Sequence, residues 1–266
     1  MIRICVAGVF GRMGRRILEL AAAADDIEIS GAFEVPPLAG RELVVGAESR
    51  HHQSIKVSAN PAAEIARSDV LIDFTAPEAS VNNVRTAAEL GKAAVVGTTG
   101  LSEAQKAALS ACAEKIAVVY APNMSVGVNL LFKLTGEVAR LLGLDYNVEI
   151  VEIHHNQKKD SPSGTAARLA ECAAEALGLD AEVDVSHGRE GLLGPRPTRQ
   201  IGMHALRGGD VVGEHSVAFI GHGERIELTH KAHSRDNFAL GALRAVRYVV
   251  TAKPGLYDMQ GVLGLR

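Results

Sequence analysis

The sequence predicts an α/β protein in which an N-terminal domain with a doubly wound parallel sheet precedes a C-terminal α+β domain with a mixed sheet. The first observation behind this prediction is that short apolar, β-branched runs alternate with helical segments up to about residue 120, as βαβ units require. The second is that the pattern changes after about residue 125 to one long helical stretch, and then to strands separated by glycine-containing turns.

The N-terminal domain is predicted from strands that are apolar throughout, as strands buried on both faces are. Strands are expected at residues 2–7, 27–33, 68–74, 93–96 and 116–120. Helices are expected at residues 12–24, 77–90 and 102–115, with Pro77 in a first turn and Ser102 as an N-cap. This alternation of strands and helices favours a single parallel sheet.

The C-terminal domain is predicted from a different set of elements. Helices are expected at residues 126–142 and 162–177, with a strand at 147–153 between them and Gly178 ending the second helix. Residues 198–233 are expected to form successive strands of an antiparallel or mixed sheet, and residues 238–250 a helix. We therefore expect a first domain at residues 1–125, with residues 235–266 packing back on it, and a second domain at residues 126–234.

The composition excludes several classes of protein. The 266 residues carry 28 Lys and Arg against 31 Asp and Glu, so the net charge of −3 gives no electrostatic case for binding nucleic acid or an anionic membrane. The apolar runs stop short of the roughly 18 residues of a membrane span, and no secretory signal is visible. The three cysteines, Cys5, Cys112 and Cys172, lie far apart and suit a reducing compartment, so a cytoplasmic protein is expected.

A glycine-rich segment, Gly8 to Gly14, lies between the first strand and the first helix. Glycines there permit a tight turn and let backbone amides approach a pyrophosphate, and the helix N-terminus adds a favourable dipole. Glu34 follows at the end of the second strand, where a carboxylate can accept hydrogen bonds from ribose hydroxyls. This pattern predicts a Rossmann-like, dinucleotide-binding first domain. The alternative is a structural glycine turn beside an ordinary surface glutamate.

Two further loops, at residues 97–100 and 121–124, follow predicted strands of the same sheet. Ligands bind at this end of such sheets, so the threonine hydroxyls and loop amides could line a nicotinamide ribose and ring. Both segments are equally typical of ordinary turns.

A basic cluster in the second domain begins with His154 and His155, continues through Lys158, and ends with Gly164 and Thr165 at a helix start. Amides at a helix N-terminus can hold a carboxylate, a lysine adds a charge-assisted hydrogen bond, and a histidine can transfer a proton. The alternative is a solvated basic loop before a Ser-capped helix.

Other catalytic chemistry has little support in the sequence. Adjacent histidines lack the spacing of metal ligands, and His215, His230 and His233 lie on predicted strands without clustered carboxylates, so no metal is expected. No G-x-S-x-G elbow is present. The stretch with His51 and His52 is polar and is expected to be a surface loop.

The segment from Glu149 to Ala166 resembles the catalytic motif of the 4-hydroxy-tetrahydrodipicolinate reductase (dihydrodipicolinate reductase) family of bacterial lysine and diaminopimelate synthesis. The glycine segment, residues 97–100, residues 122–129 and residues 207–209 also resemble segments of this family, so the resemblance covers essentially the whole chain. The basic cluster is the most specific of these segments, and its resemblance weighs strongly against a solvated loop.

The resemblance implies a homotetrameric enzyme with a nucleotide-binding N-terminal domain and a C-terminal domain for substrate binding and tetramerisation. A hydride would pass from NADH or NADPH to a cyclic unsaturated dicarboxylate, giving tetrahydrodipicolinate with loss of water. By resemblance, His154 would be the general acid/base and Lys158 the proton donor, with His155, Gly164 and Thr165 binding the substrate. The nucleotide would be held by Gly8, Val9, Phe10, Gly11, Arg12, Met13, Glu34, Gly97, Thr98, Thr99, Ala121, Pro122, Asn123 and Met124.

Two positions depart from the family pattern. Met124 stands where an aromatic residue is common, and Val35 follows Glu34 where some members carry arginine. Because a 2′-phosphate would be repelled by Glu34, NADH is expected to serve at least as well as NADPH, with Arg12 the cation that partly compensates.

Two rival functions remain open at this point. One is another two-domain NAD(P)-dependent dehydrogenase, such as an amino-acid or sugar dehydrogenase, which would share the glycine segment but has no reason to carry the basic cluster. The other is a nucleotide-sensing binding protein, which would bind nucleotide without turnover.

Overall fold

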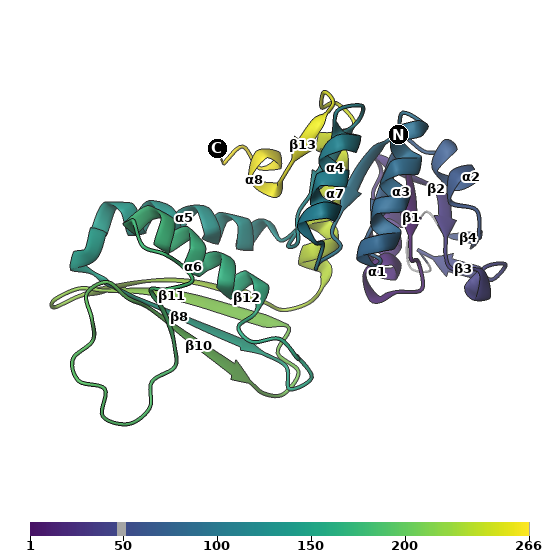
Figure 1. Ribbon diagram of the computed structural model, residues 1–266. Helices are drawn as coiled ribbons and strands as arrows, with labels where there is room; N and C mark the ends of the chain where they lie inside the picture. Colours follow the sequence, from purple (N-terminus) through teal and green to yellow (C-terminus); the bar gives the residue numbers. More distant parts are fainter. Residues whose placement is uncertain (47–51, 266) are drawn as a thin grey trace. The chain divides into compact units, whose positions relative to one another are not determined.

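The computed structural model describes residues 1–46 and 52–265 and divides into two compact units (Figure 1). The first unit comprises residues 1–126 together with the C-terminal segment that begins at Arg235. The second comprises residues 127–234. No described helix is both long enough and apolar enough to cross a membrane.

A six-stranded sheet in the order β13-β7-β6-β5-β1-β2 forms the centre of the first unit. Its strands are β1 (Ile2–Ala7), β2 (Ile27–Phe33), β5 (Val70–Asp73), β6 (Ala93–Val96), β7 (Ala117–Tyr120) and β13 (Gly255–Tyr257), and every pair is parallel. The chain starts at β1 inside the sheet and builds outward in both directions, which confirms the predicted doubly wound fold.

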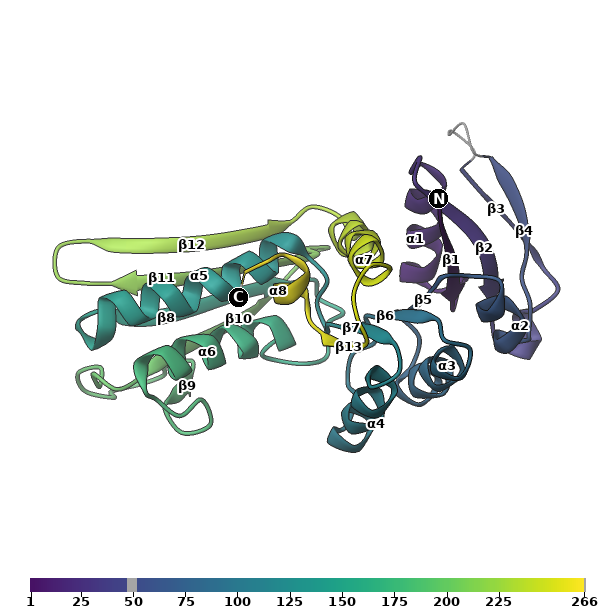
Figure 2. The same cartoon turned by 90° about the horizontal axis from the view of Figure 1, so that it is seen from above.

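Helices cover both faces of this sheet (Figure 2). On one face α1 (Arg12–Ala22) and α7 (Asp236–Val249) share a core with Ile4 and Val6 of β1. On the other, α3 (Pro77–Glu89) and α4 (Glu103–Ala113) share a core with Cys5 and Ala7. Successive residues of β1 therefore enter opposite cores, which is why the strand is apolar throughout.

The start signals read from the sequence are also confirmed. Pro77 occupies the first turn of α3. The side chain of Ser102 accepts a hydrogen bond from the Gln105 amide, and the two residues form a reciprocal capping box at the start of α4.

The first unit also contains elements that sequence reasoning did not predict. These are the 3-10 turn η1 (Pro36–Leu38), the hairpin of β3 (Glu42–Val45) and β4 (Gln53–Lys56), α2 (Pro61–Ala66), β13 and α8 (Met259–Val262). His51 lies outside the described residues, and His52 is exposed just before β4.

The second unit is built on a five-stranded mixed sheet in the order β12-β11-β8-β10-β9. The strands are β8 (Asn147–His154), β9 (Val185–His187), β10 (Ile201–Arg207), β11 (Gly213–Ile220) and β12 (Arg225–Ala232). β10 is parallel to β8 and β9, whereas β11 is antiparallel to β8 and β12. This arrangement confirms the predicted mixed sheet.

One face of the second sheet is covered by α5 (Val126–Leu142) and α6 (Gly164–Leu177), with η2 (Gly143–Asp145) between α5 and β8. Leu131 of α5 and Leu169 of α6 share a core with Ile150 and Phe219 of the sheet. Ser163 caps α6, and Gly178 ends it in the left-handed conformation. Even-numbered residues of β8 are buried and odd-numbered ones only partly so, which places Glu152 and His154 on the covered face.

Candidate active site

The glycine turn of the first unit brings backbone segments closer than side chains would permit. Gly8 adopts a positive φ of 68° and donates its amide to the Phe33 carbonyl at the end of β2. A Cβ on Gly14 would lie 2.2 Å from the Gly8 carbonyl oxygen, so the helix starts against the turn only because both residues are glycine. Gly11 precedes the first residue of α1, and no described side chain caps this helix. This cradle fits the pyrophosphate of a dinucleotide.

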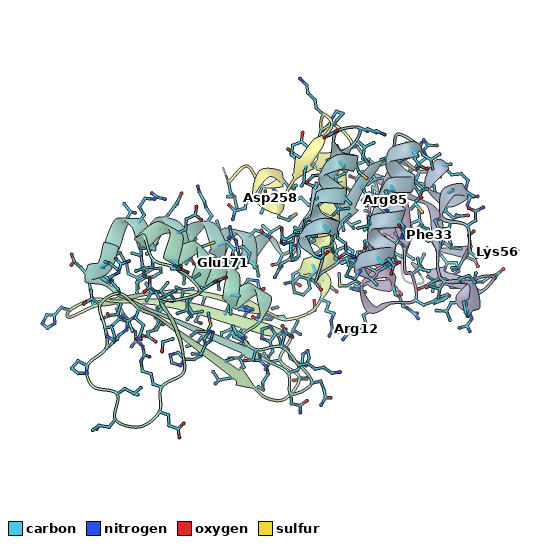
Figure 3. The ribbon with its side chains drawn as sticks, viewed as in Figure 1. Arg12, Phe33, Lys56, Arg85, Glu171 and Asp258 are labelled. Carbon is cyan, nitrogen blue, oxygen red and sulfur yellow. The ribbon has the colours of Figure 1, made fainter. Side chains whose placement is uncertain are left out.

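Glu34 lies against this turn. Its carboxylate accepts hydrogen bonds from the Phe10 amide at 3.3 Å and from the Val35 amide at 3.0 Å. The Arg41 guanidinium stands over the Phe10 ring at 5.9 Å from its centroid. Sequence reasoning missed Arg41 because η1 separates it from β2. The cation that it named, Arg12, is exposed at the start of α1 (Figure 3).

A buried carboxylate, Asp73, organises the carboxyl end of β5. It accepts hydrogen bonds from the Thr75 amide and hydroxyl, from the Ser80 and Thr98 hydroxyls, and from the Asn83 side chain. Thr98 is 4% exposed, so its hydroxyl is engaged within the unit and a ligand would meet this residue through its backbone.

The loops after β6 and β7 are shaped by packing. A Cβ on Gly97 would lie 2.0 Å from the Phe74 ring, so glycine lets that ring lie on the loop. Met124 is 1% exposed and belongs to the core shared with α7, where a Cβ on Gly241 would collide with its carbonyl. The side chain of Asn123 accepts a hydrogen bond from the Ser125 amide, and Thr99 and Pro122 are exposed.

In the second unit β8 ends at His154, whose Nδ1 lies 2.5 Å from Oε2 of Glu152. The two side chains share one face because they are two residues apart on a strand. Glu152 is fully buried, and Arg207, the register partner of His154 on β10, donates to both of its oxygens at 2.8 Å.

The N-terminus of α6 is held against the same carboxylate. The Ser163 amide donates to Oε1 of Glu152 at 2.9 Å. The Ser163 hydroxyl oxygen accepts a hydrogen bond from the Ala166 amide and lies 3.0 Å from Nε2 of His215. The rings of His215 and His154 meet edge to face at 5.1 Å. Next along α6, a Cβ on Gly164 would meet nothing within 4 Å, so its backbone borders open space.

Lys158 follows in the loop between β8 and α6. Its Nζ lies 2.9 Å from both carboxylate oxygens of Asp160, and its side chain is 18% exposed. The His155 amide donates to the Val211 carbonyl at 2.8 Å, and its side chain is partly exposed. The loop therefore presents an ammonium and an imidazole close to the start of α6.

Burial and neighbouring charges set the protonation of these groups. Burial opposes the charge on Glu152, but hydrogen bonds from Arg207, His154 and Ser163 outweigh it and keep the pKa of this carboxyl below its ordinary value. Burial lowers the pKa of His154, and the Glu152 carboxylate only partly offsets that effect. Burial, followed by the neighbouring His154, lowers the pKa of His215 to about 3.

His215 has one carboxylate neighbour that its position in the sequence does not show. Its register partner on β8 is Glu152, a neighbour that strand pairing fixes and linear spacing does not reveal. Among the described residues no three His, Cys, Asp or Glu side chains are grouped as ligands for a metal ion.

A parallel sheet with a glycine turn and an acidic residue at the end of β2, followed by a second unit with a buried histidine, is typical of nicotinamide-nucleotide-dependent oxidoreductases. Two family models divide the chain between them: the N-terminal model of dihydrodipicolinate reductase matches residues 2–124 and the C-terminal model residues 127–263. The chain therefore belongs to the dihydrodipicolinate reductase family.

Individual relatives agree with this assignment. The chain is 50% identical to a 4-hydroxy-tetrahydrodipicolinate reductase of Citrifermentans bemidjiense, over 100% of both chains. It is also 50% identical to a protein of the same name from Anaeromyxobacter sp., over 100% of this chain and 99% of the relative. A dipicolinate-bound dihydrodipicolinate reductase from Paenisporosarcina sp. shares the fold, with a TM-score of 0.78, 23% identity and 97% of each chain covered.

Proposed function

We propose that this chain catalyses the NAD(P)H-dependent reduction of 4-hydroxy-tetrahydrodipicolinate to tetrahydrodipicolinate, a step of lysine and diaminopimelate synthesis. The observation that carries the proposal is that one buried carboxylate, Glu152, binds both His154 and the N-cap amide of α6, while Lys158 lies in the loop that joins these two elements. A second dehydrogenase activity has no comparable support, because a glycine turn alone does not require this constellation.

In the proposed reaction a bound reduced nicotinamide supplies the hydride. Loss of the substrate's hydroxyl group as water gives a conjugated imine. Hydride addition to this imine places negative charge at the far end of the π-system, so a proton must arrive there. His154 is the proposed general acid/base, and Lys158 the proposed proton donor. His155 and the amides of Gly164 and Thr165 hold a substrate carboxylate, which fixes the ring for the transfer.

The proposed nucleotide site comprises the glycine turn, Glu34 and the loops after β6 and β7. Its members are Gly8, Val9, Phe10, Gly11, Arg12, Met13, Glu34, Gly97, Thr98, Thr99, Ala121, Pro122, Asn123 and Met124. The close approach of Gly8 and Gly14 supports this assignment, since a side chain at Gly14 would collide with the Gly8 carbonyl and displace the start of α1 from the turn.

We further propose that NADH serves at least as well as NADPH. The Glu34 carboxylate suits a free ribose 2′-hydroxyl and would repel a 2′-phosphate, and the neighbouring Val35 and Pro36 bring no charge. The Arg41 guanidinium, which stands over the Phe10 ring, is a second cation besides Arg12 that would offset this repulsion and keep NADPH acceptable.

The proposal extends to a homotetramer in the cytoplasm. The face of the second sheet opposite α5 and α6 carries partly or fully exposed apolar side chains, among them Val151, Ala218 and Leu206, as an interface between copies would require. Cys5, Cys112 and Cys172 are free thiols, which suits a reducing compartment.

The reaction is tested by following NADH or NADPH oxidation at about 340 nm while a condensing synthase generates the precursor. We expect turnover that depends on the synthase, with competitive inhibition by pyridine-2,6-dicarboxylate against the substrate. Nucleotide binding without turnover would identify a binding protein instead. Inhibition competitive only against nucleotide would contradict the proposed substrate site.

A further inference from the structure

The Glu152 carboxylate accepts four hydrogen bonds, which come from the His154 and Arg207 side chains and from the Ser163 amide. Its Oε2 meets Nδ1 of His154 at 2.5 Å and one Arg207 nitrogen at 2.8 Å. Its Oε1 accepts from the other Arg207 nitrogen at 2.8 Å and from the Ser163 amide at 2.9 Å. A fully buried carboxylate that accepts four hydrogen bonds from three residues stays ionised and is held in one orientation.

The hydrogen bond between Glu152 and Nδ1 of His154 determines which nitrogen of this histidine exchanges a proton. An ionised carboxylate only accepts hydrogen bonds, so Nδ1 of His154 must carry the hydrogen. Nε2 is then the nitrogen that gains or loses a proton. A Cβ on Gly213 of β11 would lie 2.9 Å from this Nε2, so glycine there leaves space beside the reactive nitrogen.

Four charged or titratable side chains from three strands and one loop face His154: Glu152, Lys158, Arg207 and His215. Of these, Glu152 alone is negative and alone favours the imidazolium. Burial and the cations Lys158 and Arg207 all oppose it. Loss of the Glu152 charge would therefore leave nothing to support a protonated His154.

We propose that Glu152 is the positioning residue of the site: it fixes the Nδ1–H tautomer of His154, supports its protonated form, and ties it to the anion-binding start of α6. Arg207 acts behind Glu152 by holding the carboxylate ionised and by donating to the Asp160 carbonyl of the Lys158 loop at 2.8 Å. Glu152 thus holds both the proposed acid/base group, His154, and the start of α6, where the substrate carboxylate is proposed to bind. The catalytic part of this inference rests on the proposed function, whereas the coupling between Glu152 and His154 does not.

The test replaces the carboxylate by an isosteric amide, Glu152→Gln. We expect kcat to fall by at least about tenfold and the alkaline limb of the kcat/KM profile to move by about one pH unit or more toward acid. The reason is that His154, without the negative charge, loses its proton at lower pH. Glu152→Asp, which keeps the charge, should retain the position of that limb better than the amide does.

Glu149→Gln is the matched control. Glu149 lies on the same strand but on the opposite face, where it binds Arg189, Arg196 and His204 at 2.7–2.9 Å. Its loss removes a comparable ion cluster that does not touch His154. A pH profile that moves equally in both variants, or in neither, would overturn the proposal.

A second measurement needs no turnover and compares the wild-type chain with Glu152→Gln. Nitrogen-15 NMR of labelled histidines should show neutral His154 protonated on Nδ1, and its pKa should fall in Glu152→Gln. A neutral His154 protonated on Nε2 would overturn the proposal even if the variant failed to fold. If the wild type does not reduce the precursor but the NMR result holds, then the proposed function fails and the Glu152–His154 coupling stands.

Discussion

Acid should destabilise the protein through His215, a group that the proposed chemistry does not use. This side chain is 4% exposed on β11, and its Nδ1 has no hydrogen-bond partner among the described residues. Burial and then the nearby His154 lower its pKa from 6.5 to about 3. Because the folded pKa lies below the unfolded one, His215 contributes stability above about pH 6.5, and that contribution is lost as the pH falls toward 3.

The size of the effect follows from the two pKa values. At about pH 5 an unfolded imidazole with a pKa of 6.5 is protonated about 30 times more often than it is neutral, whereas the folded one stays neutral. This difference favours the unfolded state by about 2 kcal/mol at 25 °C, and it is close to zero at about pH 7.5.

Urea unfolding at about pH 7.5 and about pH 5, followed by circular dichroism at fixed protein concentration, measures this loss. His215→Gln is the informative variant, since its amide can replace Nε2 toward Ser163 and cannot titrate. The wild type should lose about 2 kcal/mol more than the variant between the two pH values. His222→Gln, in the exposed turn between β11 and β12, should behave like the wild type. Equal losses in the wild type and His215→Gln would refute the reasoning.

Four further variants concern the candidate site itself. His154→Ala should lower kcat by about 10²–10⁴-fold while circular dichroism shows an intact fold, and full turnover would remove His154 from the mechanism. Lys158→Ala should lower kcat and raise KM for the dicarboxylate together, because the ammonium supplies both charge and proton. An effect of Lys158→Ala on thermal stability alone would make that lysine structural. Arg41→Ala should lower kcat/KM for NADPH by a few fold and leave NADH unchanged, whereas Val35→Arg should favour NADPH by up to about 1 kcal/mol. A wild-type preference of about tenfold or more for NADPH would contradict the expected repulsion between Glu34 and a 2′-phosphate.

The fold could be predicted because the signals for its layers are local. Residues Ile4 to Ala7 are apolar in succession since they fill two cores, and only a strand covered on both faces needs that. β13 has no such signal. It is three residues long and owes its place to pairing with β7, far away in the sequence. The β3–β4 hairpin likewise joins two strands of only four residues, one mostly apolar (ELVV) and the other mostly polar (QSIK).

The candidate site likewise contains residues that the sequence predicts and residues that it does not. The residues from His154 to Thr165 are contiguous, so their chemistry could be predicted from the sequence. Arg207 and His215 reach Glu152 and His154 only through strand register, and Arg41 reaches the glycine turn only after an intervening 3-10 turn. Long-range contacts of this kind leave no linear spacing to detect.

Glu149 and Glu152 show why a charged side chain cannot be assigned a role from its neighbours in sequence. Both lie on β8, and each binds arginine and histidine side chains. Three residues along a strand reverse the direction of the side chain, so the two carboxylates face opposite sides of one sheet. Glu149 holds Arg189 and Arg196, on either side of the exposed Leu192 and Leu193, at the face without covering helices. Helix α6 covers the other face and brings the amide of its N-cap residue, Ser163, to Glu152. Glu152 is therefore a candidate for a role in catalysis and Glu149 is not, because only Glu152 lies on the face of the sheet that α6 covers.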